Sequence, residues 1–282
     1  MFVCFCYTTR MLRKGKFNIK LLSIIVPSYR QERTIIKDIN NISRTLKDLG
    51  VKFEIIVVVD GIIDKTHQKL AKVRTKNIKV IAYKKNEGKG HAIRYGVLKA
   101  KGDVVGFIDA GMDIHPAGFS MLLNHMDWYN AHIIVGSKLH PVSKVNYPFY
   151  RTILSWGYRL LTWMLFGFKV KDTQVGLKFF KRKVARDVFP RLLVKRYAFD
   201  IEMLAVAYAL GYTRIYEAPV RIKFSMNSII SKSLWTTIFL MIWDTFAVFY
   251  RLKILHYYTK KQAKRRVKIL NKKASILLGF NK

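Results

Sequence analysis

The sequence predicts an α/β fold built on a mostly parallel sheet, and three observations support that prediction. Of the 282 residues, 51% are apolar, which is ample material for a core. From residue 21 onward, short β-branched runs alternate with longer segments of helical period, in the order β-α-β-α-β-α-β. Each short run ends in polar residues or glycine. This alternation is typical of parallel sheets with helices on both faces.

The expected elements follow the chain in order. Four strands are expected from apolar runs in the first half, at residues 21–27, 53–60, 78–83 and 104–110. Helical periodicity between them predicts helices at residues 34–49, 65–74 and 89–100. The second half is less regular, with strands expected at 132–138, 176–180 and 214–222 and a helix at 200–210. Two aromatic-rich apolar segments, 153–170 and 234–250, complete the pattern.

Chemistry-bearing residues follow the expected strands of the first half. They occupy residues 27–32, 60–61, 86–90 and 109–113. In open α/β sheets, ligands bind outside the carboxyl ends of the strands. We therefore expect the active site at that edge of the sheet.

Asp60 ends the second expected strand, where its carboxylate can accept hydrogen bonds from a base or from ribose hydroxyls. Asp64 follows one helical turn later and fits an N-cap or first-turn acid, so we assign it a structural role. The segment 86–90, Asn-Glu-Gly-Lys-Gly, precedes a helix. Its backbone N–H groups and Lys89 could meet an anion, or its glycines could serve only as turn formers.

Asp109 and Asp113 stand at the end of the fourth expected strand, in a chain with only 17 acidic residues. Carboxylates placed in this way are typical of a divalent-metal site that serves a diphosphate. The alternative is that Asp113 caps a helix ahead of Pro116. The sequence indicates the metal site without deciding between these two roles.

The chain carries a large positive surplus, with 52 Lys and Arg against 17 Asp and Glu, or +35. Such a surplus predicts an anionic partner: nucleic acid, anionic lipid or a phosphate-bearing substrate.

The aromatic segments 153–170 and 234–250 are interrupted by charges, which favours helices at a membrane interface over helices that span it. Buried core helices are the alternative. Residues 251–282 contain no acid and predict a basic amphipathic helix on an anionic membrane, or else a solvated or RNA-contacting tail.

Several motifs occur in a fixed order: P-S-Y, then D-G-x-x-D-x-T, then N-x-G-K-G-x-A-I-x-x-G, then I-D-A. This order resembles the family 2 glycosyltransferases of the GT-A fold. The later motifs D-T-Q-V-G-L-K-F-F, A-F-D-I-E-M-L and A-P-V-R-I resemble the dolichyl- or polyprenyl-phosphate glycosyltransferases, and the first of them favours the glucosyl branch. The resemblance covers about residues 21–255. It implies a GT-A sheet flanked by helices, with interfacial helices toward the C-terminus.

The resemblance implies an inverting transfer of glucose or mannose from a UDP- or GDP-sugar to polyprenyl or dolichyl phosphate, with Mg²⁺ or Mn²⁺. By position it assigns the nucleotide-sugar to Pro27, Tyr29, Glu32, Asp60, Lys89, Asp109 and Lys232. It assigns the acceptor phosphate to Lys138 and Arg151, the metal to Asp109 and Asp113, and catalysis to Asp109 and Asp172. A phosphate monoester is mostly ionised at pH 7, so we expect Asp172 to orient groups or support the metal rather than to act as a base.

The chain departs from the family pattern near the nucleotide. The family's P-x-Y-N-E-E reads P-S-Y-R-Q-E here, with Arg30 and Gln31 in place of Asn and Glu. Its D-D-G-S reads V-D-G-I, so Val59 and Ile62 replace an acid and a hydroxyl. These changes bear on the choice of donor.

A second group of departures bears on the metal and on a phosphate contact. The family's D-A-D reads D-A-G, so Gly111 stands where a second metal carboxylate is expected. We expect Asp113 to restore that charge. Met226 stands at the Arg of the family's R-x-x-G-x-S-K.

Residues 1–20 are expected to be an N-terminal extension, 21–225 the catalytic domain, and 226–282 an interfacial helix with a basic tail. The two cysteines, at positions 4 and 6, are too close for a framework disulfide, so a reducing compartment and the cytoplasmic face of a membrane are expected. Two alternatives stay open: a family 2 enzyme with a soluble glycan or other acceptor, and a degenerate, non-catalytic nucleotide-sugar-binding protein. No nucleic-acid-binding motif occurs, so no nucleic acid partner is expected.

Overall fold

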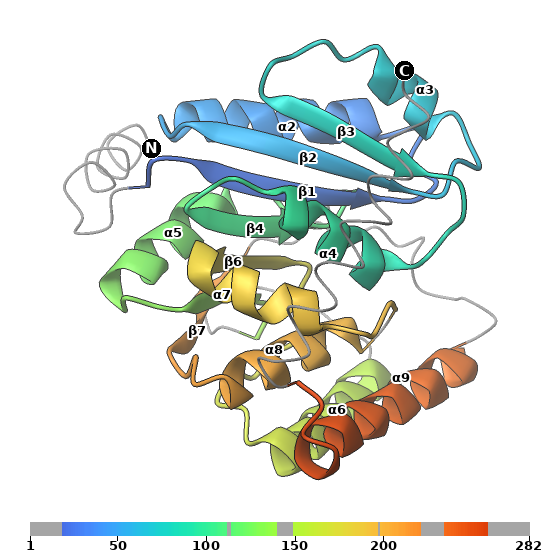
Figure 1. The fold of residues 1–282 in the computed structure, drawn as a ribbon, viewed down its shortest axis with the longest axis vertical. Helices are drawn as coiled ribbons and strands as arrows, with labels where there is room; N and C mark the ends of the chain where they lie inside the picture. Colours follow the sequence, from blue (N-terminus) through green and yellow to red (C-terminus); the bar gives the residue numbers. More distant parts are fainter. Residues whose placement is uncertain (1–18, 112–113, 140–148, 197, 221–233, 259–282) are drawn as a thin grey trace.

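The computed structural model describes residues 19–111, 114–139, 149–196, 198–220 and 234–258. Within these residues, seven strands form one sheet in the order β3-β2-β1-β4-β6-β5-β7 (Figure 1). The strands are β1 (Leu22–Ser28), β2 (Phe53–Asp60), β3 (Ile78–Tyr83), β4 (Val104–Ile108), β5 (Ile133–Ser137), β6 (Leu177–Lys181) and β7 (Ile215–Pro219). β6 runs antiparallel to β4 and β5, and the other described pairs are parallel. The predicted mostly parallel α/β sheet is confirmed.

The helices of the described chain are α2 (Ile35–Asp48), α3 (Thr66–Ala71), α4 (Lys89–Lys99), α5 (Gly118–Trp128), α6 (Phe149–Phe166), α7 (Arg182–Val188), α8 (Phe199–Ala209) and α9 (Leu234–Phe249). A short 3-10 turn (Phe189–Arg191) follows α7, and a π-helical turn (Tyr250–Ile254) follows α9. The sequence predicted neither α5 nor α7. The helix expected at residues 65–74 is longer than the observed α3, which ends at Ala71.

Both faces of the sheet are buried, which explains why its central strands are continuous apolar runs rather than alternating ones. In β1, Ile25 belongs to the core on the α4, α7 and α8 side, whereas Ile24 and Val26 belong to the core on the α2 and α5 side. Successive strand side chains point to opposite faces, so one strand serves both cores. Each such fully buried side chain contributes about 1.5–3 kcal/mol.

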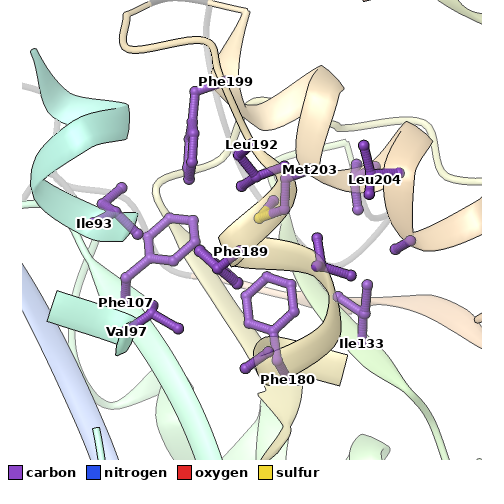
Figure 2. Packing of buried hydrophobic residues seen from close by; sticks show 14 of the residues in the cluster. Ile93, Val97, Phe107, Ile133, Phe180, Phe189, Leu192, Phe199, Met203 and Leu204 are labelled. Carbon is purple, nitrogen blue, oxygen red and sulfur yellow. The ribbon is translucent and has the colours of Figure 1, made fainter. Parts of the chain in front are cut away.

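The first of these cores is rich in aromatic rings. Figure 2 shows Phe107 of β4, Phe180 of β6 and Phe199 of α8 gathered between the sheet and the helices. The rings of Phe107 and Phe180 are 6.2 Å apart, and those of Phe107 and Phe199 are 6.4 Å apart. This packing fixes α8 against the strands whose ends form the cleft described below.

Helices α6 and α9 lie side by side at one end of the molecule (Figure 1). The Tyr158 hydroxyl of α6 is 2.8 Å from the Thr245 hydroxyl of α9. The pair exposes a row of large apolar side chains: Trp156, Leu160, Trp163, Met164, Phe239, Leu240, Trp243 and Phe246. The alternative of two buried core helices is therefore wrong for these faces. No helix in the described part of the chain is both long enough and apolar enough to cross a bilayer.

Candidate active site

A cleft of about 750 Å³ opens at the carboxyl ends of β1, β2 and β4, at the edge that the sequence predicted. Its lining includes Pro27, Ser28 and Tyr29 from the end of β1, Asp60 from β2, and Asp109 just after β4. These positions come together because parallel strands present their carboxyl ends at one edge of a sheet.

Asp60 is buried, with 3% of its surface exposed, and both of its carboxylate oxygens are already used. It accepts hydrogen bonds from the Tyr83 hydroxyl (2.8 Å), the Asn86 amide (2.9 Å) and the backbone N–H groups of Glu87 (2.8 Å) and Gly88 (3.0 Å). A carboxylate has about four acceptor sites. Although Asp60 lines the cleft, its carboxylate organises the segment after β3, and it would have to give up one of these partners to bind a base or a ribose directly.

The segment 86–90, for which an anion site and simple turns both stayed open, uses the N–H groups of Glu87, Gly88 and Gly90 within the protein, which favours the turn alternative. The N–H groups of Glu87 and Gly88 are bound by Asp60, while those of Gly90 (2.8 Å) and His91 (3.4 Å) point to the carbonyl of Lys195. The start of α4 is therefore capped by the chain's own loop after α7. Sequence pattern missed this cap because the two segments meet only in the folded protein.

Lys89 instead reaches across the cleft to Asp109, with 2.7 Å between its ammonium nitrogen and Oδ2. The other oxygen of Asp109, Oδ1, is buried and has no hydrogen-bond partner in the described part of the chain. A buried carboxylate oxygen without a partner is costly unless a ligand satisfies it. This oxygen is the feature of the cleft that fits a divalent cation, which prefers such ligands.

Gly176, in the motif D-T-Q-V-G, makes room for this carboxylate. A Cβ atom on Gly176 would lie 1.9 Å from Oδ2 of Asp109, and the carbonyl of Gly176 accepts the Asp109 backbone N–H at 3.0 Å. The glycine of the D-T-Q-V-G motif therefore leaves the space that the Asp109 carboxylate occupies.

Gly111 occupies the position where the family pattern has a second metal carboxylate. Gly111 has φ +94°, a left-handed conformation that L side chains rarely adopt, and its N–H donates to the buried Asp38 at 3.0 Å. Asp113, which we expected to compensate, lies outside the described residues. Within the described chain, no group of three or more His, Cys, Asp or Glu side chains comes together as a metal site.

Asp172 and Lys138 lie together, but neither is among the side chains that line the cleft. The Asp172 carboxylate accepts the backbone N–H of Lys138 at 2.8 Å, and its own N–H donates to Glu217 at 2.8 Å. Burial raises the pKa of Asp172, and the hydrogen bond from Lys138 opposes that shift. In this structure Asp172 links Lys138, which follows β5, to Glu217 of β7, and its expected role near the acceptor stays a prediction.

Glu32 is not part of the lining either; its carboxylate accepts the backbone N–H of Lys65 at 3.1 Å, at the start of α3. Asp64 accepts the N–H of Thr66 at 3.0 Å, which agrees with the structural role predicted for it. Lys232 lies outside the described residues, as does the side chain of Arg151.

The structure adds cleft residues that sequence reasoning missed. They come from segments far along the chain: Gln174, Arg196, Asp200 and Met241. Asp200 had a readable signal, because it is an acid inside the apolar run A-F-D-I-E-M-L. Its carboxylate pairs with the fully buried Lys178 of β6 at 2.5 Å. Arg196 had no signal, because only the fold carries its loop to the cleft.

This fold and cleft define an open α/β protein with a ligand-binding edge, and comparison with known proteins shows its family. Residues 23–189 match the model of Glycosyl transferase family 2, which is more than half of the chain, so the chain belongs to that family. Human dolichyl-phosphate beta-glucosyltransferase is 34% identical over 204 residues, and that of Dictyostelium discoideum is 32% identical over 207. Each alignment covers 67% of this chain and 63% of the relative, so the chain spans just under two thirds of their length.

Solved structures show the same fold. Glucosyl-3-phosphoglycerate synthase from Mycobacterium tuberculosis, in complex with Mn²⁺, UDP-glucose and phosphoglyceric acid, matches with a TM-score of 0.64 at 17% identity, over 87% of this chain and 83% of that one. Mannosyl-3-phosphoglycerate synthase from Rubrobacter xylanophilus also reaches 0.64, at 16% identity, over 87% and 78%. The predicted GT-A fold is confirmed.

Proposed function

We propose that this chain transfers glucose from UDP-glucose to dolichyl or polyprenyl phosphate at a membrane surface. The observation that carries the proposal is the continuity between the cleft and the aromatic helix pair. Met241 of α9 lines the cleft, while Phe239 and Trp243 of the same helix are exposed. A lipid phosphate that rises from a bilayer in contact with α9 would meet the donor at this edge.

The family relatives support the choice of reaction, because their names state a glucosyl transfer to dolichyl phosphate. In the proposed step, a phosphate oxygen of the acceptor forms the new bond to the anomeric carbon. The bond from that carbon to the nucleoside diphosphate breaks, with inversion. The acceptor needs little activation, because its second pKa is near 6.

The cleft residues take roles within this proposal. Pro27 and Tyr29 hold the nucleoside, and Lys89 fixes the Asp109 carboxylate at the cleft through its Oδ2 oxygen. We also assign Lys138 and Arg151 to the acceptor phosphate and Lys232 to a donor phosphate.

A bound Mg²⁺ or Mn²⁺ would neutralise the departing diphosphate. Asp109 would hold it, with Asp113 as the second carboxylate; phosphate oxygens and water commonly complete such sites. The Mycobacterium tuberculosis neighbour was solved with Mn²⁺, which supports this class of metal.

The place of action follows from surface chemistry. The surplus of +35 favours an anionic membrane, and the exposed rings of α6 and α9 favour shallow insertion. We place the protein on the cytoplasmic face.

The test is transfer of labelled hexose from a panel of UDP- and GDP-sugars to polyprenyl phosphate in detergent, with Mn²⁺, Mg²⁺ or EDTA. We expect a metal-dependent glucolipid, its loss in Asp109→Asn, and normal turnover in the exposed control Asp48→Asn. Product on a soluble phosphate monoester alone would contradict the lipid acceptor. Nucleotide-sugar binding without any product would favour the non-catalytic alternative.

A further inference from the structure

We infer that the Arg196 guanidinium binds the diphosphate of the sugar donor, as a cation supplied by the protein in addition to any metal. This inference rests on the function proposed above. Arg196 lies in the loop between the 3-10 turn and α8 and lines the cleft, where its side chain is exposed.

The charges of the cleft single out this arginine. Five charged side chains line it in the described part of the chain: Asp60, Lys89, Asp109, Arg196 and Asp200. The Lys89 ammonium is bound to Asp109 at 2.7 Å. For the Arg196 guanidinium, by contrast, the described residues supply neither a hydrogen bond nor an ion pair. It is therefore the lining cation that a ligand can engage without breaking an existing pair.

The ligand chemistry fits that cation. A nucleoside diphosphate presents adjacent phosphate oxygens with several negative charges, and a guanidinium offers planar, paired N–H donors that match them. A fixed side-chain cation would stabilise the negative charge that develops as the diphosphate leaves.

The structure also holds the arginine in place. Gly88, at φ +100°, has no side chain, and a Cβ there would lie 2.5 Å from the Lys195 carbonyl and 3.0 Å from Cγ of Arg196. The loop and the stem of Arg196 can therefore lie directly on Gly88. That glycine is itself fixed by its hydrogen bond to Asp60 at 3.0 Å.

Lys195, the residue before Arg196, holds this loop through two contacts. The Lys195 carbonyl accepts the Gly90 N–H at 2.8 Å, and the Lys195 ammonium forms an ion pair with Glu87. This pairing lowers the pKa of Glu87. Arg196 thus stands beside the segment that carries Lys89, whose ammonium is bound to Asp109.

Helix α9 contributes Met241 to the cleft that Arg196 lines. Burial raises the pKa of Asp244 in α9, and the charges of Arg251 and Arg196 oppose that shift. Between Asp244 and Arg196 the described structure has no ion pair. Arg196 therefore lines the same cleft as Met241 of the proposed membrane-facing helix, and among the described residues it forms no ion pair with Asp244 of that helix.

The test is calorimetric binding of UDP and GDP, and of uridine and guanosine, with and without Mn²⁺. Arg196→Gln should weaken binding of the preferred diphosphate by about tenfold or more, because a charge-assisted contact is lost, and leave binding of its nucleoside unchanged. Arg196→Lys should recover part of the affinity. Arg186→Gln, an exposed arginine of α7, is the matched control and should bind as the wild type does.

The outcomes separate this inference from the proposed function. If the wild type binds UDP or GDP and Arg196→Gln binds it equally well, the inference is wrong and the proposed function stands. Equal losses for diphosphate and nucleoside would also overturn it, because they would show that the effect of Arg196 is not specific to the diphosphate. A wild type that binds no nucleoside diphosphate at all would overturn both.

Discussion

The Lys178 ammonium lies 2.5 Å from the Asp200 carboxylate, and the two side chains are 0% and 8% exposed. The same ammonium donates to the Val175 carbonyl at 2.6 Å and lies 5.3 Å from the centre of the Phe107 ring. Burial lowers the pKa of Lys178, and the Asp200 carboxylate opposes that shift. Asp200 lines the cleft, so this pair connects a charged residue of the cleft to the buried lysine beside Phe107.

We expect Lys178→Met to lower the free energy of unfolding by about 3–5 kcal/mol, since removing one partner leaves a buried charge without compensation. Urea denaturation followed by circular dichroism measures this. The control is Lys181→Met on the same strand, whose partner is the exposed Asn130; it should cost less than about 1 kcal/mol. The double variant Lys178→Met/Asp200→Leu should recover much of the loss, and equal losses in Lys178→Met and Lys181→Met would contradict the prediction.

We expect Gly176→Ala to abolish metal-dependent transfer while the protein stays folded. The added Cβ would lie 1.9 Å from Oδ2 of Asp109, so the carboxylate must move from its place beside Lys89. Displacing a positioned group by about 1 Å can cost on the order of 100-fold in rate. Turnover with Mn²⁺ and thermal melting are the measurements. Gly157→Ala in α6, where a Cβ meets nothing within 4 Å, should be active, and normal turnover in Gly176→Ala would refute the prediction.

We expect the double variant Trp163→Ser/Trp243→Ser to lose most of its binding to anionic liposomes. These rings are 59% and 65% exposed on α6 and α9, where they can enter the bilayer interface. Cosedimentation measures the bound fraction. Trp128→Ser on α5 is the matched control, because its ring is also 59% exposed but lies on another helix. If Trp128→Ser reduces binding as much as the double variant does, α6 and α9 are not the membrane contact.

We expect His91 to make the protein less stable as the pH falls below about 6.5, the ordinary value for histidine. Burial lowers the pKa of His91, and the charge of Arg94 adds to the shift. The unfolded state therefore binds the proton more readily, so this stabilisation is present above the unfolded pKa and is lost as pH falls through the folded value. His91→Phe, which keeps a ring against Tyr83 and Tyr95, should flatten the dependence between pH 7.5 and 5. Urea melts across that range test this, and identical slopes for both proteins would contradict it.

Local pattern predicted the first four strands well, because β1, β2 and β4 are mostly apolar and are buried on both faces. Helix α5, which precedes β5, was missed, and so was α7 in the less regular second half, where it is only seven residues long. The family motifs correctly placed Asp60 and Asp109 at the cleft. Asp172, Lys138 and Glu32 do not line this cleft, and the roles that the motifs assign to them stay predictions.

The sequence alone determined the sheet, the family and the edge at which the cleft opens, because apolar runs and motif order are local properties of the chain. Tertiary structure decided what each charge does. Lys195 and Glu87 are 108 residues apart in sequence, yet their ion pair holds the loop that brings Arg196 to the cleft. Likewise, only the folded structure shows that the Asp60 carboxylate accepts hydrogen bonds from the backbone N–H groups of Glu87 and Gly88. Hydrogen bonds and ion pairs depend on distances between remote segments, and only the packed core fixes those distances.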